Sequence, residues 1–236
     1  MEQMEHQMMG YDRTSAMFSP DGRLLQVEYA KKAVRQGITA VGIVCKDGVV
    51  LVADKRVTEK LMVAKSVEKV VQIDDHITAA SSGFMMDGRV LLERSQLIAQ
   101  QHRVANDEPI EMIELVKEIA DLKQFYTQYG GARPFGVSIL FAGVDDKPRL
   151  YVTDPTGIYF EYKATAIGED EVEIKNILNK EYKETMNIDE GIKLAISALK
   201  RTLKKDFSMD RIDGAYITEK DRMYTKIDSK IFKKEK

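Results

Sequence analysis

Hydrophobic residues fall in short blocks along most of this chain, and the first blocks come in pairs. Residues 39–45 and 48–54 are rich in β-branched side chains and flank a Lys-Asp-Gly turn signal. A second pair of blocks, 69–74 and 76–82, is broken by two consecutive aspartates. The pattern predicts two antiparallel hairpins in series.

A helical period replaces this alternation after Gly88, where apolar residues recur at three- to four-residue spacing as far as Val104. Pro109 suits the first turn of a second helix, which Gly130 and Gly131 should end. Further strands are predicted at 136–143, 149–154, 157–162 and 164–168, then two amphipathic helices through Ile177 and Ile192, then strands near 212–218 and 223–227.

Strands in runs and helices in pairs are typical of antiparallel sheets covered by helices, rather than of alternating parallel α/β folds. The predicted fold class is therefore α+β, a four-layer αββα sandwich. The chain shows neither an internal repeat nor a long linker, so a single domain is expected.

Composition excludes several classes of function. With 36 basic and 38 acidic residues, the formal net charge is −2, which favours neither nucleic acid nor an anionic membrane as a partner. The apolar runs are too short to span a bilayer, and the first ten residues lack the regions of a signal peptide. A single cysteine, Cys45, excludes an internal disulfide. We expect a cytoplasmic protein with a lysine-rich, solvated end.

Motifs for metal and phosphate chemistry are incomplete. His6, His76 and His102 stand at no ligand spacing, so neither a metal site nor a cofactor is expected. Gly131 and Gly136 have the separation of a phosphate loop, but Val137 replaces the required lysine, and a turn leading into a strand explains them better.

Ser-x-x-Lys, a spacing used by some acyl enzymes, occurs at Ser66–Lys69 and Ser197–Lys200. Lys200 belongs to an amphipathic helix and is expected to be solvated. Lys69 opens an apolar strand, where two interpretations stay open: exposure at the strand end, or recognition of a carboxylate as a point charge.

An unusual helix is predicted behind Ser19-Pro20, a pair that suits a helix start. Helical projection of residues 24–35 gives a polar arc of Glu28, Lys31, Lys32 and Arg35 and a wide apolar arc, with Leu24 in the polar arc. We expect this helix to contact its own domain and a second body. The alternative is an ordinary N-terminal helix with one exposed leucine.

Several longer strings resemble one family. They are "YDR" at 11–13, "FSPDGRLLQVEYA" at 18–30, "GITAVGI" at 37–43, "SVEKV" at 66–70, "QYGGARPFGVSILFAG" at 128–143 and "DPTG" with "EYKATAIG" at 154–168. Together they resemble the archaeal type of proteasome α-subunit. The resemblance implies an Ntn-hydrolase-like sandwich with an extra N-terminal helix, assembled in seven-membered α-rings that cap rings of catalytic β-subunits.

The resemblance also bears on catalysis. The family's β-subunits attack with a mature N-terminal threonine whose own amine acts as base. Alignment places Ile38 at that position, behind an arm and helix that are retained, while Asp54 and Lys69 stand where the β-subunits carry their active-site Asp and Lys. The resemblance therefore implies a noncatalytic subunit with no catalytic residues.

Two site assignments follow from the resemblance. Lys69, with Gly37, Gly83, Leu24 and Glu28 around it, would bind the C-terminal tails of activators such as AAA+ ATPase rings. Tyr11, Asp12, Pro20 and Tyr29 would stabilise an open gate, with residues 1–18 as the gate arm and 19–236 as the domain. Unfolded proteins would pass through the gate. Lys31 and Lys32 replace the family's usual Arg and Glu, so charge pairing between neighbouring subunits is expected to differ.

Three other interpretations remain open. A self-processing hydrolase of the same fold would need a hydroxyl or thiol near Gly37, which Ile38 does not provide. A serine acyl enzyme would use Ser66 and Lys69. A scaffold without a gate is compatible with the same sequence.

Overall fold

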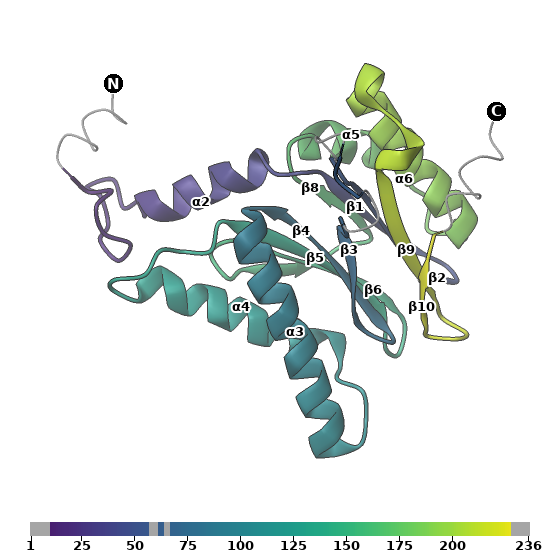
Figure 1. Ribbon diagram of the computed structural model, residues 1–236, viewed down its shortest axis with the longest axis horizontal. Helices are drawn as coiled ribbons and strands as arrows, with labels where there is room; N and C mark the ends of the chain where they lie inside the picture. The colour runs from purple at the N-terminus through teal and green to yellow at the C-terminus, as the bar shows by residue number, and fades with distance from the viewer. Residues whose placement is uncertain (1–9, 57–60, 64–66, 228–236) are drawn as a thin grey trace.

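The computed structural model describes residues 10–56, 61–63 and 67–227 (Figure 1). Within these residues, the strands form two five-stranded sheets in which every pairing is antiparallel. The predicted order of strands and helices is confirmed.

The first sheet is built on a tight hairpin. Strands β1 (Ala40–Cys45) and β2 (Gly48–Asp54) pair from Ala40–Ala53 to Cys45–Gly48, which leaves a two-residue turn. Strands β8 (Ala164–Ile167), β9 (Ile212–Thr218) and β10 (Tyr224–Lys226) complete it in the order β10-β9-β2-β1-β8. Strand β2 is buried along its whole length, as its continuous apolar sequence predicts.

The second sheet has the order β3-β4-β5-β6-β7. Its strands are β3 (Val70–Asp74), β4 (Ile77–Gly83), β5 (Val137–Val144), β6 (Pro148–Thr153) and β7 (Tyr159–Glu161). A register shift between Gln72 and Asp74 bulges β3 just before the predicted break at Asp74-Asp75.

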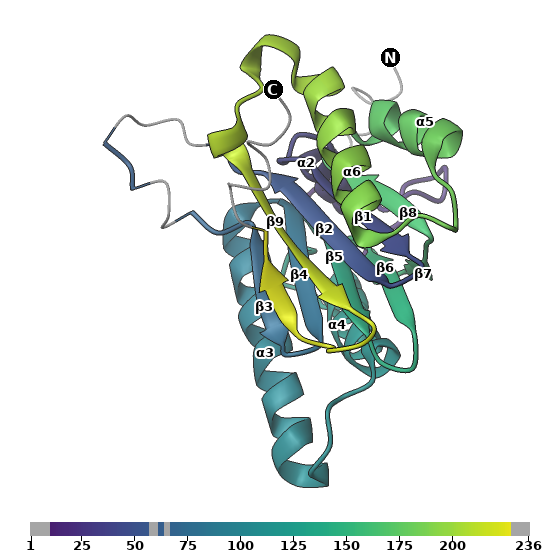
Figure 2. The same cartoon turned by 90° about the vertical axis from the view of Figure 1, so that its right-hand side faces the viewer.

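Helices cover the outer faces of both sheets (Figures 1 and 2). Helices α3 (Met85–Asn106) and α4 (Met112–Gln128) pack on the second sheet, and α5 (Glu171–Glu181) and α6 (Ile188–Leu203) pack on the first. The start of α6 is fixed by a capping box, in which the Asn187 and Glu190 side chains each accept the other's backbone N–H at 2.9 Å. Two short 3₁₀ turns, Lys204–Asp206 and Met209–Arg211, lead into β9.

Three apolar cores separate the four layers. Residues such as Leu51 and Leu140 fill the space between the two sheets. A second core, including Ile43 and Leu199, lies under α5 and α6, and a third, including Phe141 and Ile119, lies under α3 and α4. These cores confirm the αββα sandwich.

Helix α2 (Leu25–Arg35) precedes β1 and carries the N-terminal segment away from the sandwich (Figure 1). It buries Leu25, Val27, Ala30 and Val34, so the predicted contact with its own domain is confirmed. Contact with a second body stays a prediction.

Three helix starts differ from the sequence-based prediction. Helix α2 begins at Leu25, because Ser19 closes a separate turn: its Oγ accepts the Arg23 N–H at 3.2 Å, and its carbonyl accepts the Gly22 N–H at 2.8 Å. Helix α3 begins before Gly88, since Gly88 provides a close approach to the Ser81 side chain rather than a boundary. Pro109 lies three residues before α4, outside its first turn.

No helix among residues 10–56, 61–63 and 67–227 combines the length and the hydrophobicity needed to cross a membrane. Cys45 is buried in β1, facing the close helix contact at Gly191.

Candidate functional site at the N-terminal helix

Lys69 lies directly before β3 and is half-buried. Its backbone N–H donates to Asp213 Oδ2 at 2.8 Å, and the Val70 N–H donates to the same oxygen at 3.1 Å, so the start of the strand is fixed from β9. Burial lowers the pKa of the Lys69 ammonium, and the Asp54 carboxylate opposes this effect.

A cavity of about 480 Å³ opens beside Lys69. Met85, Met86 and Leu92 form its apolar wall, and both methionines are two-thirds exposed. Ser81 and Met85, which flank Gly83 in the chain, also line it. A cation next to exposed apolar side chains suits a ligand that combines a carboxylate with an apolar group.

Gly37 and Gly83 are in direct contact. A Cβ atom on Gly37 would lie 2.2 Å from the Gly83 backbone nitrogen, and one on Gly83 would lie 2.1 Å from the Gly136 carbonyl oxygen. Gly83 also has φ +122, a conformation that favours glycine. The structure therefore brings these two predicted site residues together, two positions along the chain from the cavity-lining Ser81 and Met85.

Leu24 and Glu28 lie at the opposite end of α2 from Gly37. The 11-residue helix separates the two ends by roughly 16 Å. Leu24 is the N-cap residue of the helix and is half-buried, and its carbonyl accepts the Glu28 N–H at 3.1 Å. Glu28 is held by an ion pair with Arg23. Within one chain, these residues do not line the Lys69 cavity.

The predicted gate residues are partly brought together. The Tyr29 hydroxyl lies 3.5 Å from Asp12 Oδ2, and the Gln26 side-chain amide donates to the Asp12 carbonyl. Tyr11 is half-buried in a turn at residues 10–13, and Pro20 is exposed in the turn that Ser19 closes. Residues 1–9 of the predicted arm lie outside the described residues.

Backbone hydrogen bonds hold the segment between α2 and β1 in place. Gly37 joins α2 to Ile38, its N–H donates to the Val34 carbonyl at 2.9 Å, and its carbonyl accepts the Glu169 N–H at 2.9 Å. Asp54 is the residue that the sequence comparison aligned with an active-site aspartate. It is 1% exposed, and it accepts hydrogen bonds from two nitrogens of the Arg211 guanidinium at 2.6 and 2.9 Å. This carboxylate is thus already engaged.

Sequence reasoning missed two buried ionic groups. Asp87, in the first turn of α3, accepts two Arg133 N–H groups, each at 2.7 Å, and the Gly136 N–H at 2.8 Å. Lys123 is fully buried in α4, and its Nζ donates to Thr153 Oγ1 at 2.7 Å. The sequence did contain an indication that Lys123 is buried, because this residue lies on the same face of the helix as Val116 and Ile119.

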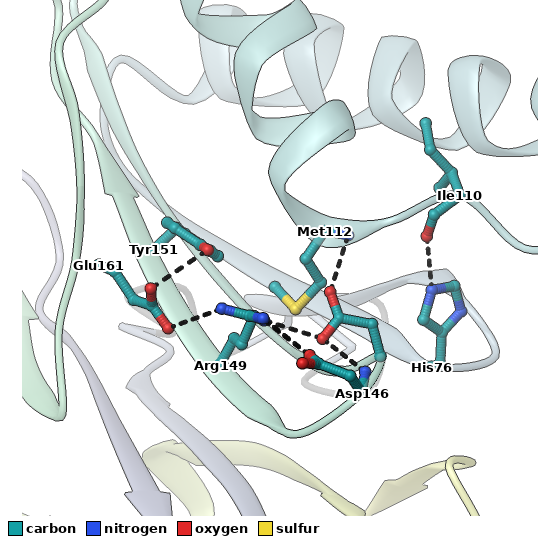
Figure 3. A network of polar contacts seen from close by, with 8 residues as sticks. His76, Ile110, Met112, Asp146, Arg149, Tyr151 and Glu161 are labelled. Atoms are coloured by element: carbon teal, nitrogen blue, oxygen red, sulfur yellow. Dashed lines mark hydrogen bonds and ion pairs between the residues drawn. The ribbon is translucent and has the colours of Figure 1, made fainter.

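The described histidines make structural contacts. His76 Nε2 lies 2.9 Å from the Ile110 carbonyl, as Figure 3 shows, and His102 contacts the Glu108 carbonyl and Glu114. In the same view Arg149 lies between Asp146 and Glu161. No group of three or more potential metal ligands occurs in the part of the chain that the structure describes.

The remaining motifs have simple outcomes. Lys200 is exposed on α6, as predicted, and Gly131 belongs to a loop that leads into β5. Ser66, the proposed partner of Lys69 in an acyl enzyme, lies outside the described residues.

Comparison with known proteins gives a consistent result. A family model described as "Proteasome subunit" matches residues 34–217, and a model of the N-terminal signature of A-type proteasome subunits matches residues 11–33. The proteasome alpha subunit of Pyrococcus abyssi is 54% identical over 218 residues, which are 92% of this chain and 84% of that protein. The corresponding protein of Methanocaldococcus jannaschii is 51% identical over 225 residues, 95% of this chain and 86% of that protein. The N-terminal signature covers the turn at Ser19 and most of α2, the features that precede β1 in this fold. The chain therefore belongs to the proteasome subunit family and is of the alpha type.

Proposed function

We propose that this chain is a noncatalytic α-subunit that forms the outer seven-membered ring of a 20S core, controls access to the β-subunit chamber and docks activator tails. The observation that carries the proposal is that α2, buried on the sandwich through Leu25 and Val34, leads through Gly37 to Ile38, directly before the first sheet. An N-terminal nucleophile needs a free amine and a hydroxyl or thiol side chain at this point. Here the nitrogen is part of a peptide bond and the side chain is that of isoleucine.

Docking of tails is supported by the cavity beside Lys69. A tail that ends in a carboxylate next to an apolar and a tyrosine side chain would place its carboxylate at Lys69 and its apolar groups against Met85 and Met86. Leu24 and Glu28 lie a helix length away from Gly37 in one chain. We infer that a neighbouring copy supplies them, so the pocket lies between adjacent α-subunits.

Gating is assigned to the residues before α2. The Asp12–Tyr29 contact supports a role for these residues in orienting the arm, and the exposed turn at Pro20 is where the arm would change direction. In this proposal residues 1–18 are the gate arm and 19–236 the domain. The partners are other α-subunits, β-subunits, an AAA+ ATPase or similar activator, and unfolded protein substrates in transit.

The test is hydrolysis of a fluorogenic peptide by the chain alone, by the chain with β-subunits, and by that particle with a peptide that ends in the activator motif. We expect activity only with β-subunits, stimulation by the peptide, and loss of stimulation in Lys69→Ala. Lys200→Ala, which removes an exposed lysine from α6, is the matched control and should respond like the wild type.

Two outcomes would contradict the proposal. Hydrolysis by the chain alone, in protein shown by mass spectrometry to be free of β-subunits, would show that a nucleophile exists. Equal stimulation of the wild type and Lys69→Ala would remove Lys69 from the docking site.

A further inference from the structure

The turn between β6 and β7, residues 154–158, is shaped by one side chain. Asp154 Oδ1 accepts the backbone N–H of Thr156 at 2.8 Å and that of Ile158 at 3.2 Å. The Asp154 N–H in turn donates to the Ile158 carbonyl at 3.0 Å. One carboxylate oxygen therefore holds the turn in a single conformation.

The turn rests on α4. Gly157 has φ +84, and a Cβ atom there would lie 2.4 Å from the Ala120 carbonyl oxygen. Close by on the same helix, the buried Lys123 donates to the carbonyl and to the hydroxyl of Thr153, the residue directly before Asp154. The residues before and after Asp154 therefore both contact α4, a helix of the packed core.

The second oxygen of Asp154 extends in another direction. Oδ2 lies 3.1 Å from the Lys31 ammonium on α2, where Lys31 is half-buried. Lys31, Val34 and Asp154 line one cavity of about 330 Å³ between α2 and the ends of β6 and β8. Asp154 therefore joins the N-terminal helix to a rigid part of the sandwich.

We propose that Asp154 is a positioning residue: its ion pair with Lys31 sets how α2 is seated on the sandwich. The apolar contacts of Leu25 and Val34 hold the helix on the surface, and these contacts are non-directional. An ion pair to a fixed turn adds a directional contact in the middle of the helix. The inference rests on the proposed function only in one respect, the roles given to Leu24, Glu28 and Tyr29. Glu28 and Tyr29 lie in α2, and Leu24 directly precedes it.

The variant Asp154→Asn separates the two tasks of this side chain. Its amide oxygen can still accept the N–H groups of the turn, while the amide nitrogen replaces the charged oxygen that faces Lys31. Lys31→Met removes the same ion pair from the other side. Glu171→Gln is the matched control, because Glu171 lines the same cavity but pairs with Lys175 on α5.

The measurement is hydrogen exchange of the α2 backbone amides, followed by mass spectrometry, in the particle assembled with β-subunits. We expect exchange to become about two- to fivefold faster in Asp154→Asn and Lys31→Met, because partly exposed ion pairs contribute modestly. The double variant should be no faster than either single variant, and Glu171→Gln should match the wild type.

Two results would overturn the inference: unchanged α2 exchange in Asp154→Asn, or faster exchange in the turn and α4 with none in α2. Stimulation by the tail peptide, measured on the same samples, separates this inference from the proposed function. Faster α2 exchange with unaltered stimulation would leave Asp154 as the positioning residue and contradict the docking role of Leu24 and Glu28. Unchanged α2 exchange, with stimulation that still depends on Lys69, would overturn the positioning role of Asp154 and leave the docking role of Lys69 in place.

Discussion

Gly37 packs directly on the backbone of Gly83, so that the segment leaving α2 and the end of β4 approach more closely than any side chain would permit. Ser81 and Met85, each two residues from Gly83 in the chain, line the Lys69 cavity. The two glycines therefore permit a close approach of the chain at the C-terminal end of the N-terminal helix.

Gly37→Ala should destabilise the fold, because its Cβ would lie 2.2 Å from the Gly83 nitrogen and neither backbone can move freely. We expect urea unfolding of the chain to show a loss of about 1–3 kcal/mol in the free energy of unfolding. Gly130→Ala is the control, since nothing lies within 4 Å of a Cβ there. Equal stability of the two variants would contradict the close contact.

Arg211→Met should be among the most destabilising single changes. Asp54 is 1% exposed, and without the guanidinium its charge would remain buried without its main partner. The expected loss is about 3–5 kcal/mol. Arg201→Met breaks the exposed pair with Glu181 and should cost less than about 1 kcal/mol, so similar losses in both variants would count against the prediction.

Asp87 should stabilise the protein in a pH-dependent way. Burial raises the pKa of its carboxyl, but hydrogen bonds from Arg133 and the Gly136 N–H outweigh burial, and the net pKa is lowered. A carboxyl whose pKa is lower in the folded state stabilises the fold above the pKa of the unfolded chain, about 3.9, and loses this contribution as pH falls through the folded-state value.

The corresponding measurement compares the wild type with Asp87→Asn by chemical denaturation. The difference in free energy of unfolding should be constant between about pH 5 and 7 and should shrink toward pH 3. Glu93→Gln removes an exposed partner of Arg89 on the same helix and should show only a small difference throughout. A difference that stays constant down to pH 3 would disprove the assignment.

Lys123 should show a pH dependence of the same sign in a higher pH range. Burial lowers the pKa of its ammonium from 10.5 to about 7, with Asp154 opposing the change. Between these two values the unfolded chain binds more protons than the folded one, so stability rises with pH. Relative to Lys123→Met, the wild type should gain up to about 1.4 kcal/mol per pH unit above pH 7. Lys117→Met, at an exposed position of α4, is the matched control and should change the stability little. A pH-independent difference for Lys123→Met would show that the buried amine does not titrate in this range.

The strands could be predicted because their signals are local. Continuous β-branched runs and two-residue turns identified β1 and β2 to within a residue of their observed bounds. Helix starts were less predictable. Ser19-Pro20 and Asp87-Gly88 consist of residues that commonly begin helices, but in this fold they make other contacts. Ser19 closes a turn, and Asp87 holds the distant Arg133.

For the candidate site, the sequence could indicate which residues belong to it but not which of them are in contact. The contact of Gly37 with Gly83 joins segments more than forty positions apart, and no spacing in the sequence indicates it. The pairing of Asp54 with Arg211 joins β2 to the turn before β9 in the same way. By contrast, the position of Ile38 after a retained helix could be read directly, since it depends on neighbours in the chain.

The burial of Cys45 gives the molecule a practical property. Burial, with a smaller contribution from Asp47 and Glu190, raises the pKa of its thiol to about 12, so almost no reactive thiolate exists at neutral pH. Since the 236 residues contain no other cysteine, the folded chain is nearly inert toward thiol reagents. The variant Phe18→Cys, at a position that is 62% exposed, would therefore carry a fluorescent or spin label at one known place, on the segment that leads into the N-terminal helix.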